Sequence, residues 1–169
     1  EAFAPISDLP LPEAKQFDMN AYAPGRYKVS KPDAVQTSIR IGKNGVSLLD
    51  EDYTDFQILN MVLGGYFGSR LMSNIREEKG YTYGIGSYNV TMPLASYWMI
   101  ATDVNAEQSE ATIEECMKEI RRLQTELIPE EELNLVKSYF NGELLRELDG
   151  VFAQSDALKH KLNYGIDNT

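Results

Sequence analysis

"SRLMSNIREEKGYTYGIG", from Ser69 to Gly86, changes from a helical pattern to a strand pattern at one glycine. Ser69 is a suitable N-cap for a short helix, and three apolar residues follow at helical spacing: Leu71, Met72 and Ile75. Gly80 can adopt the left-handed conformation that commonly ends a helix. A strand is predicted to follow from about residue 81 to 90. The stretch therefore predicts a helix that leads directly into a sheet.

Two more strands are predicted on either side of this stretch. Between residues 34 and 42, apolar and β-branched residues alternate with polar ones, which is typical of a half-buried strand: Val35, Thr37, Ile39 and Ile41. Another strand is predicted from about residue 96 to 104, after a turn near Pro93. The three strands indicate one sheet.

Helical spacing dominates the remaining segments. A helix from about residue 50 to 65 has an apolar face and two glycines at its end: Phe56, Leu59, Leu63, Gly64 and Gly65. A second helix, with a capping box expected from Asn105 to Gln108, has another apolar face: Ile113, Cys116, Ile120, Leu123 and Leu127. A third begins at Pro129 and buries a similar set: Leu133, Val136, Phe140 and Leu144. A weaker helical pattern runs from about residue 152 to 162.

The order of these elements predicts an α+β fold with a mostly antiparallel sheet and helices packed on one face, a two-layer sandwich. The 169 residues are enough for one domain with a sizeable core. The proline-containing residues 1–30 are expected to be a linker or an extended lead-in from a preceding domain. Residues 31–169 are then expected to form a single α+β domain.

Composition excludes several classes of function. The net charge of −10 would repel a nucleic acid backbone, and no basic run is interleaved with aromatic residues. No run approaches the roughly 20 apolar residues needed to cross a bilayer, so membrane insertion is not expected. The compartment stays open between cytoplasm and periplasm, because a targeting sequence could lie upstream of Glu1.

The chain also lacks the residues for several kinds of catalytic site. His160 is the only histidine and Cys116 the only cysteine, so no two-histidine zinc site can be built from this chain alone. His160 lies between lysines on a predicted amphipathic helix, which favours a surface role. Gly64 and Gly65 are followed by no Gly-Lys-Ser/Thr motif, which excludes an ordinary phosphate loop. No metal-binding residue and no catalytic residue is therefore predicted in this chain alone.

Three blocks in order resemble one family of enzymes. "KPDAVQTSIRIG", "LGGYFGSRLMSNIREEKGYTYGIGS" and "EIRRLQTELIPEEELNLVKSYFNGEL" are similar to the pitrilysin (insulinase) family of zinc peptidases, in its processing-peptidase-like branch. The resemblance covers roughly residues 31 to 145. It implies the half-domain that lacks zinc, partnered by a homologous zinc-bearing half upstream in the same chain or in a separate subunit. It also implies that the domain is truncated at its C-terminal end.

Arg76 and Tyr83, seven residues apart in "REEKGYTY", match the pair that holds the substrate backbone beside the metal in this family. The resemblance therefore implies that they bind extended peptide substrates and donate hydrogen bonds to the carbonyl that becomes an oxyanion. On the residues alone, Arg76 could merely favour a helix end, and Tyr83 could simply pack in the sheet. Two other functions stay open: a catalytically silent scaffold subunit, and a peptide-binding module without hydrolysis that uses a sheet edge.

Overall fold

The computed structural model describes residues 23–92, 95–147 and 149–165. Contacts within the chain divide it into two units, Glu1–Ser30 and Lys31–Thr169. Of the first unit, residues 23–30 are described; they are exposed, and the hydroxyl of Tyr27 donates to the carbonyl of Ala23 at 2.8 Å. That residues 1–30 are a linker stays a prediction. The turn expected near Pro93 lies outside the described residues.

The second unit contains a three-stranded antiparallel sheet, which confirms the predicted fold class. Its strands are β1 (Gln36–Asn44), β2 (Thr82–Met92) and β3 (Ala95–Asn105), in the order β1-β3-β2. Ile39 lies opposite Thr102, and Ile41 lies opposite Ile100, so these residues share one face of the sheet. Four side chains of β3 on that face are buried: Trp98, Ile100, Thr102 and Val104. The alternation read in the sequence thus identifies the face that carries the core.

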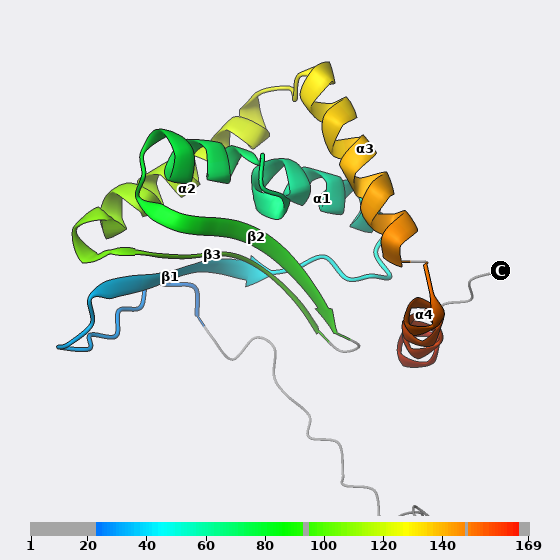
Figure 1. Ribbon diagram of the computed structural model, residues 1–169. Helices are drawn as coiled ribbons and strands as arrows, with labels where there is room; N and C mark the ends of the chain where they lie inside the picture. Colours follow the sequence, from blue (N-terminus) through cyan, green and yellow to red (C-terminus); the bar gives the residue numbers. More distant parts are fainter. Residues whose placement is uncertain (1–22, 93–94, 148, 166–169) are drawn as a thin grey trace, which may run out of the picture. The chain divides into compact units, whose positions relative to one another are not determined.

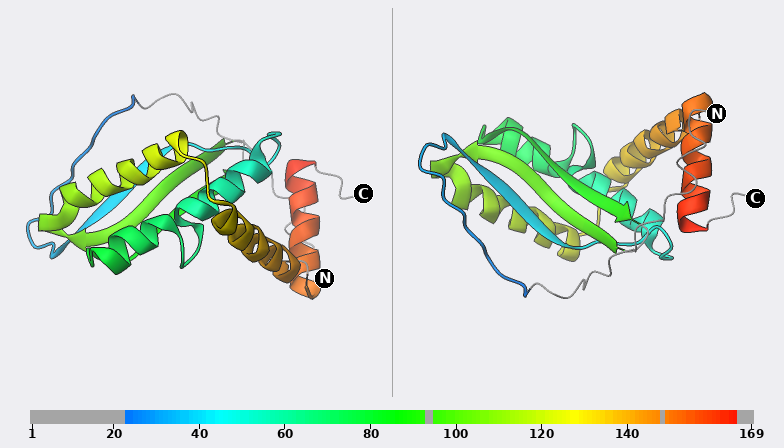
Figure 2. Two further views of the ribbon diagram at one scale, coloured as in Figure 1. Left: turned by 90° about the horizontal axis from the view of Figure 1, so that it is seen from above. Right: turned by 90° about the horizontal axis from the view of Figure 1, so that it is seen from below.

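Helical segments cover this face. After β1 the chain forms α1 (Tyr53–Asn60), continues as a π-helical segment η2 (Met61–Gly65), and forms a second π-helical segment η3 (Met72–Glu78) before β2. After β3 come a short 3₁₀ turn η4 (Ala106–Gln108), then α2 (Ser109–Thr125), α3 (Glu130–Glu147) and α4 (Val151–Tyr164). Figure 1 shows α1 and α2 on one side of the sheet, and both views of Figure 2 place them on that same side.

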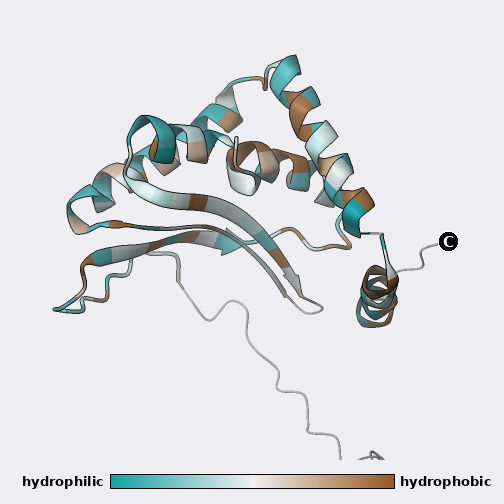
Figure 3. Ribbon diagram, in the orientation of Figure 1, coloured by the Kyte–Doolittle hydropathy of each residue, from teal (hydrophilic) through white to brown (hydrophobic). Residues whose placement is uncertain are grey.

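The core lies between the sheet and these helices. Four of its residues are completely buried: Leu71, Ile75, Ile100 and Cys116. Leu71 and Ile75 come from the stretch that predicted the helix, so its apolar stripe is confirmed as a core face. Each such side chain contributes about 1.5–3 kcal/mol through removal of its surface from water. Along α3, hydrophobic and hydrophilic residues alternate (Figure 3), and Val136 is the side chain that α3 buries completely.

A buried polar cluster joins α1 to the sheet. Asn60 accepts a hydrogen bond from the indole nitrogen of Trp98 at 2.7 Å, and its amide donates to the carbonyl of Ser87 at 3.1 Å. The hydroxyl of Ser87 donates back to the carbonyl of Asn60. This reciprocal pairing brings η2 so close to β2 that a Cβ on Gly64 would lie 2.6 Å from the backbone nitrogen of Ser87. Gly64 is therefore required by packing against β2.

Some local predictions are wrong. The expected capping box does not form, because neither Asn105 nor Gln108 makes a side-chain capping bond, and η4 occupies that position instead. Ser69 does not cap with its side chain either: its hydroxyl is buried and has no hydrogen-bond partner among the described residues. Leu127 is 96% exposed because α2 ends at Thr125, two residues before it. Leu59 is also exposed, so it does not belong to the buried face of α1.

Candidate functional site

The end of the η3 helix presents Arg76 at the start of β2. Gly80 has a φ of +64°, in the left-handed region, as the sequence predicted. The amide of Tyr81 donates to the carbonyl of Ile75 at 3.0 Å, and the amide of Lys79 donates to that of Asn74 at 3.1 Å. These bonds satisfy carbonyls at the helix end and turn the chain into the strand. Arg76 is therefore held in the last turn of a helix, one tight reversal from β2.

The start of β2 contains a β-bulge that the sequence analysis did not predict. Thr82 pairs with Val104 and Ile85 with Thr102, so Tyr83 and Gly84 both stand opposite one residue of β3. Bulges often re-aim a side chain near a functional site. Here Tyr83 is 94% exposed, whereas Ile85 after the bulge is buried. The signal in the sequence was Gly84, a glycine inside a strand pattern.

Two threonine hydroxyls hold the bulge. The hydroxyl oxygen of Thr82 lies 2.9 Å from the carbonyl of Gly84 and 2.8 Å from that of Asp103, and it accepts from the amide of Gly84 at 3.2 Å. The hydroxyl of Thr102 lies 2.8 Å from that of Thr82 and 2.9 Å from the carbonyl of Gly84. These contacts replace ladder hydrogen bonds that a bulge leaves unmade. The shape of the backbone under Tyr83 thus depends on Thr82 and Thr102.

The structure brings Arg76 and Tyr83 together. The guanidinium carbon of Arg76 lies 5.9 Å from the centroid of the Tyr83 ring and 4.6 Å from that of Phe67. Tyr83 packs against almost nothing, which argues against the alternative that it is a sheet-packing residue. Phe67, in the loop before η3, is 64% exposed and was not selected from the sequence. The half-buried Arg76, whose side chain is 28% exposed, therefore lies close to the exposed ring of Tyr83 and to the ring of Phe67.

Arg76 keeps its hydrogen-bond donors unused. Among the described residues it has no hydrogen-bond acceptor, and its one ion pair, to the neighbouring Glu77, is 3.9 Å long. The phenol of Tyr83 likewise has no hydrogen-bond partner in this part of the chain. An arginine and a tyrosine with free donors on one surface can both donate to a backbone carbonyl or to a negatively charged oxygen.

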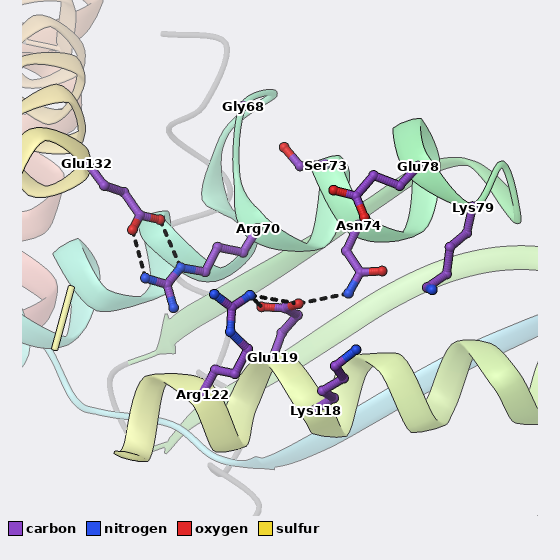
Figure 4. Close-up of a pocket in the computed structure, with 10 residues that line it drawn as sticks. All are labelled: Gly68, Arg70, Ser73, Asn74, Glu78, Lys79, Lys118, Glu119, Arg122 and Glu132. Atoms are coloured by element: carbon purple, nitrogen blue, oxygen red, sulfur yellow. Dashed lines mark hydrogen bonds and ion pairs between the residues drawn. The ribbon is translucent and has the colours of Figure 1, made fainter. Parts of the chain in front are cut away.

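A network of buried and partly exposed charges anchors the helix that carries Arg76 to α2 and α3 (Figure 4). Arg70 donates to Glu132 of α3 through two nitrogens, at 2.8 and 2.7 Å, and this pairing raises the pKa of the guanidinium. Asn74 donates to Glu119 of α2 at 2.7 Å, and Arg122 donates to the same carboxylate at 3.0 Å. A bidentate pair of this kind fixes geometry as well as charge.

These residues line a groove of about 350 Å³ that does not include Arg76 or Tyr83. The groove therefore belongs to the packing of the helices rather than to the candidate site, because Arg70 is paired with Glu132 and Arg122 with Glu119 across it.

The remaining candidate groups do not form a catalytic centre. Within the described ranges, no three histidine, cysteine, aspartate or glutamate residues gather to hold a metal ion. His160 stacks on Tyr164 within α4, with ring centroids 5.7 Å apart. Burial raises the pKa of the Cys116 thiol to about 12, which leaves it protonated and unreactive at neutral pH. The residues of this part of the chain therefore do not fit a zinc site.

Comparison with known proteins identifies the family. Residues 3–140 match the family model described as the Peptidase M16 inactive domain, so the chain belongs to this family. A zinc protease of Rickettsia felis is 29% identical over 154 residues, which cover 90% of this chain and 37% of that protein. The zinc protease YmxG of Bacillus subtilis is 29% identical over 119 residues, which cover 70% of this chain and 29% of that protein.

The solved structures agree with this assignment. The crystal structure of a peptidase M16 inactive domain from Pseudomonas fluorescens has a TM-score of 0.73 and 28% sequence identity to this chain, covering 80% of this chain and 32% of that one. The chain thus spans about a third of the length of the relatives it matches. In the described residues, no helix is long and apolar enough to cross a membrane.

Proposed function

We propose that this chain is the substrate-holding, non-zinc half of a zinc endopeptidase. The observation that supports the proposal most is the meeting of Arg76 and Tyr83, which carry unused donors on one exposed surface. Donors that bond to no acceptor in the described residues can bind an acceptor from outside the chain. The backbone carbonyls of an extended peptide would use both side chains.

Each residue has a distinct role in this proposal. Arg76 carries a permanent charge and several donors in a fixed plane, so it can bind a peptide carbonyl before the reaction and during it. Tyr83 has a single neutral donor, whose hydrogen bond strengthens as the carbonyl oxygen gains negative charge. Arg76 therefore contributes to capture and to turnover, and Tyr83 mainly to turnover.

The metal belongs to a partner in this proposal. The described residues of the chain do not fit zinc, whereas the relatives that extend beyond it are named zinc proteases. We infer a homologous, zinc-bearing half in the same polypeptide or in a separate subunit. The role of this chain would then be to hold and polarise the peptide at the interface with that half.

The test uses the intact protease that contains this chain and an unstructured peptide as substrate. Tyr83→Phe removes only the hydroxyl and is expected to lower the turnover number by about 10² to 10³ with little change in melting temperature. Arg76→Gln is expected to raise KM and to lower kcat. Tyr88→Phe, on the same strand and 49% exposed, is the matched control and should leave both constants unchanged.

Two outcomes would favour other functions. Unchanged turnover in Tyr83→Phe would remove Tyr83 from the site and leave Arg76 as its only member. If Arg76→Gln also has normal kinetics, the substrate-holding role is wrong. An intact protein that cleaves no peptide but still assembles with a partner would favour the catalytically silent scaffold, and one that binds peptides without cleaving them would favour a binding module.

A further inference from the structure

Two arginines on the same helix are held in opposite ways. Arg70 lies at its start, with its side chain 10% exposed, and both its Nε and one Nη donate to the carboxylate of Glu132. Arg76, six residues later, lies over the ring of Phe67, and the nearest carboxylate is that of its neighbour Glu77 at 3.9 Å. Two nitrogens of Arg70 therefore form hydrogen bonds within the fold. Arg76 forms no hydrogen bond with the described residues, and its charge is paired there only with Glu77.

We propose that Phe67 is a positioning residue that holds the Arg76 guanidinium ready for the peptide carbonyl. A cation over an aromatic ring is attracted by the negative face of the ring, and the 4.6 Å separation is well inside the range of this interaction. The contact is with a ring and not with a carboxylate or carbonyl, so no oxygen of the described residues forms a hydrogen bond with the N–H donors of the guanidinium. An acidic partner in the same place would instead compete with the substrate for those donors.

The loop that carries Phe67 is fixed independently of Arg76. The ring of Tyr66 packs on Tyr139 of α3, with centroids 5.2 Å apart, and the amide of Ser69 donates to the carbonyl of Tyr66 at 3.1 Å. A Cβ on Gly68 would lie 2.9 Å from the Tyr66 ring, so the loop passes closely around that side chain. The backbone that carries Phe67 is consequently held by contacts that do not involve Arg76.

Exposure supports a role beyond packing. Phe67 is 64% exposed and lies outside the hydrophobic core cluster, so its ring is not needed to fill the core. The ring lies against a cation that makes no hydrogen bond with the described residues and whose ion pair there, to Glu77, is 3.9 Å long. The inference rests on the proposed function of Arg76 in holding peptide.

The test compares Phe67→Leu with Phe67→Trp in the intact protease. Leu keeps an apolar side chain but loses the ring, and kcat/KM is expected to fall about two- to fivefold, the factor equivalent to an exposed cation–π contact. Trp keeps an aromatic face and should restore activity to near the wild-type value. In an Arg76→Gln background, Phe67→Leu should have no further effect, because the two residues act as one unit.

A second measurement does not depend on activity. In the NMR spectrum, the side-chain protons of Arg76 should be shifted upfield by the Phe67 ring, and this shift should vanish in Phe67→Leu and persist in Phe67→Trp. If Arg76→Gln lowers activity but Phe67→Leu has normal kinetics in every background, the positioning role of Phe67 is wrong and the proposed function stands. If Arg76→Gln has no effect, the proposed function fails, and the positioning role fails with it.

Discussion

The β-bulge at Tyr83 allows a test of whether the backbone hydrogen bonds of β2 position this side chain. Thr102 is 4% exposed, and its hydroxyl lies 2.8 Å from the hydroxyl of Thr82 and 2.9 Å from the carbonyl of Gly84. Thr102→Val replaces that hydroxyl with a methyl group of similar size. Gly84 keeps Thr82 as a hydrogen-bond partner, so no buried carbonyl is left unpaired. The expected loss of stability is therefore about 1 kcal/mol, that of one ordinary hydrogen bond.

The activity of this variant is expected to fall by more than its stability suggests. Displacement of a catalytic group by about 1 Å can cost up to about 10²-fold in rate, so turnover should drop by a factor between about 5 and 10². If Thr102 acts through Tyr83, the double variant Thr102→Val, Tyr83→Phe should be no slower than Tyr83→Phe alone. The assay is steady-state peptide cleavage by the intact protease, with urea unfolding of each variant.

Thr112→Val is the matched control. Thr112 is fully buried, and its hydroxyl donates to the carbonyl of Gln108 at 2.8 Å within the helical turn at the start of α2. Its loss should cost a similar free energy of unfolding, about 1 kcal/mol, without moving Tyr83. If both variants lose equal stability and both keep normal turnover, the bulge does not position Tyr83, and the reasoning is wrong.

Two more predictions concern stability. Gly64→Ala should lower the free energy of unfolding by about 1–3 kcal/mol in urea titrations, because the new Cβ would lie 2.6 Å from the Ser87 nitrogen. The control, Gly142→Ala, should be neutral or stabilising, because nothing lies within 4 Å of the new Cβ. Equal effects of the two substitutions would contradict the packing argument. The hydrogen bond from Asn74, together with the charges of Lys118 and Lys79, lowers the pKa of Glu115. The ionised carboxylate therefore stabilises the fold above the ordinary pKa of 4.5, and this contribution is lost as the pH falls through the lowered pKa. Glu115→Gln should thus be less stable than wild type at pH 7, and the gap should close in acid; a gap that persists at pH 2 would show that the charge is not responsible.

Much of the fold follows from local patterns. The alternation of Ile39 and Ile41, the helical spacing of Leu71 and Ile75, and the glycine at position 80 each predict what the structure shows, because spacing alone decides which side chains can share a face. The same pattern, with the resemblance in "REEKGYTY", identified Arg76 and Tyr83 as the candidate pair. Their role in binding substrate stays a prediction.

Other features depend on contacts between distant parts of the chain. The capping box at Asn105 was wrong because the end of β3 and the η4 turn determine how α2 begins. The bulge at Tyr83 depends on the hydroxyl of Thr102, on another strand, and the anchoring of Arg70 depends on Glu132, which is 62 residues away. Neither Thr102 nor Glu132 can be identified as a partner from the periodicity of apolar residues in the sequence.

The sequence by itself therefore determined the class of fold, the helix end at Gly80 and the two residues of the candidate pair. Only the tertiary structure decided which groups surround them. It placed Phe67 against Arg76, exposed Tyr83 through the bulge, and left the donors of Arg76 without a hydrogen bond to the described residues, while two nitrogens of Arg70 were paired with Glu132. The physical reason is that spacing along the chain fixes the face on which a side chain lies, whereas its partners are fixed by the packing of segments that are remote in sequence.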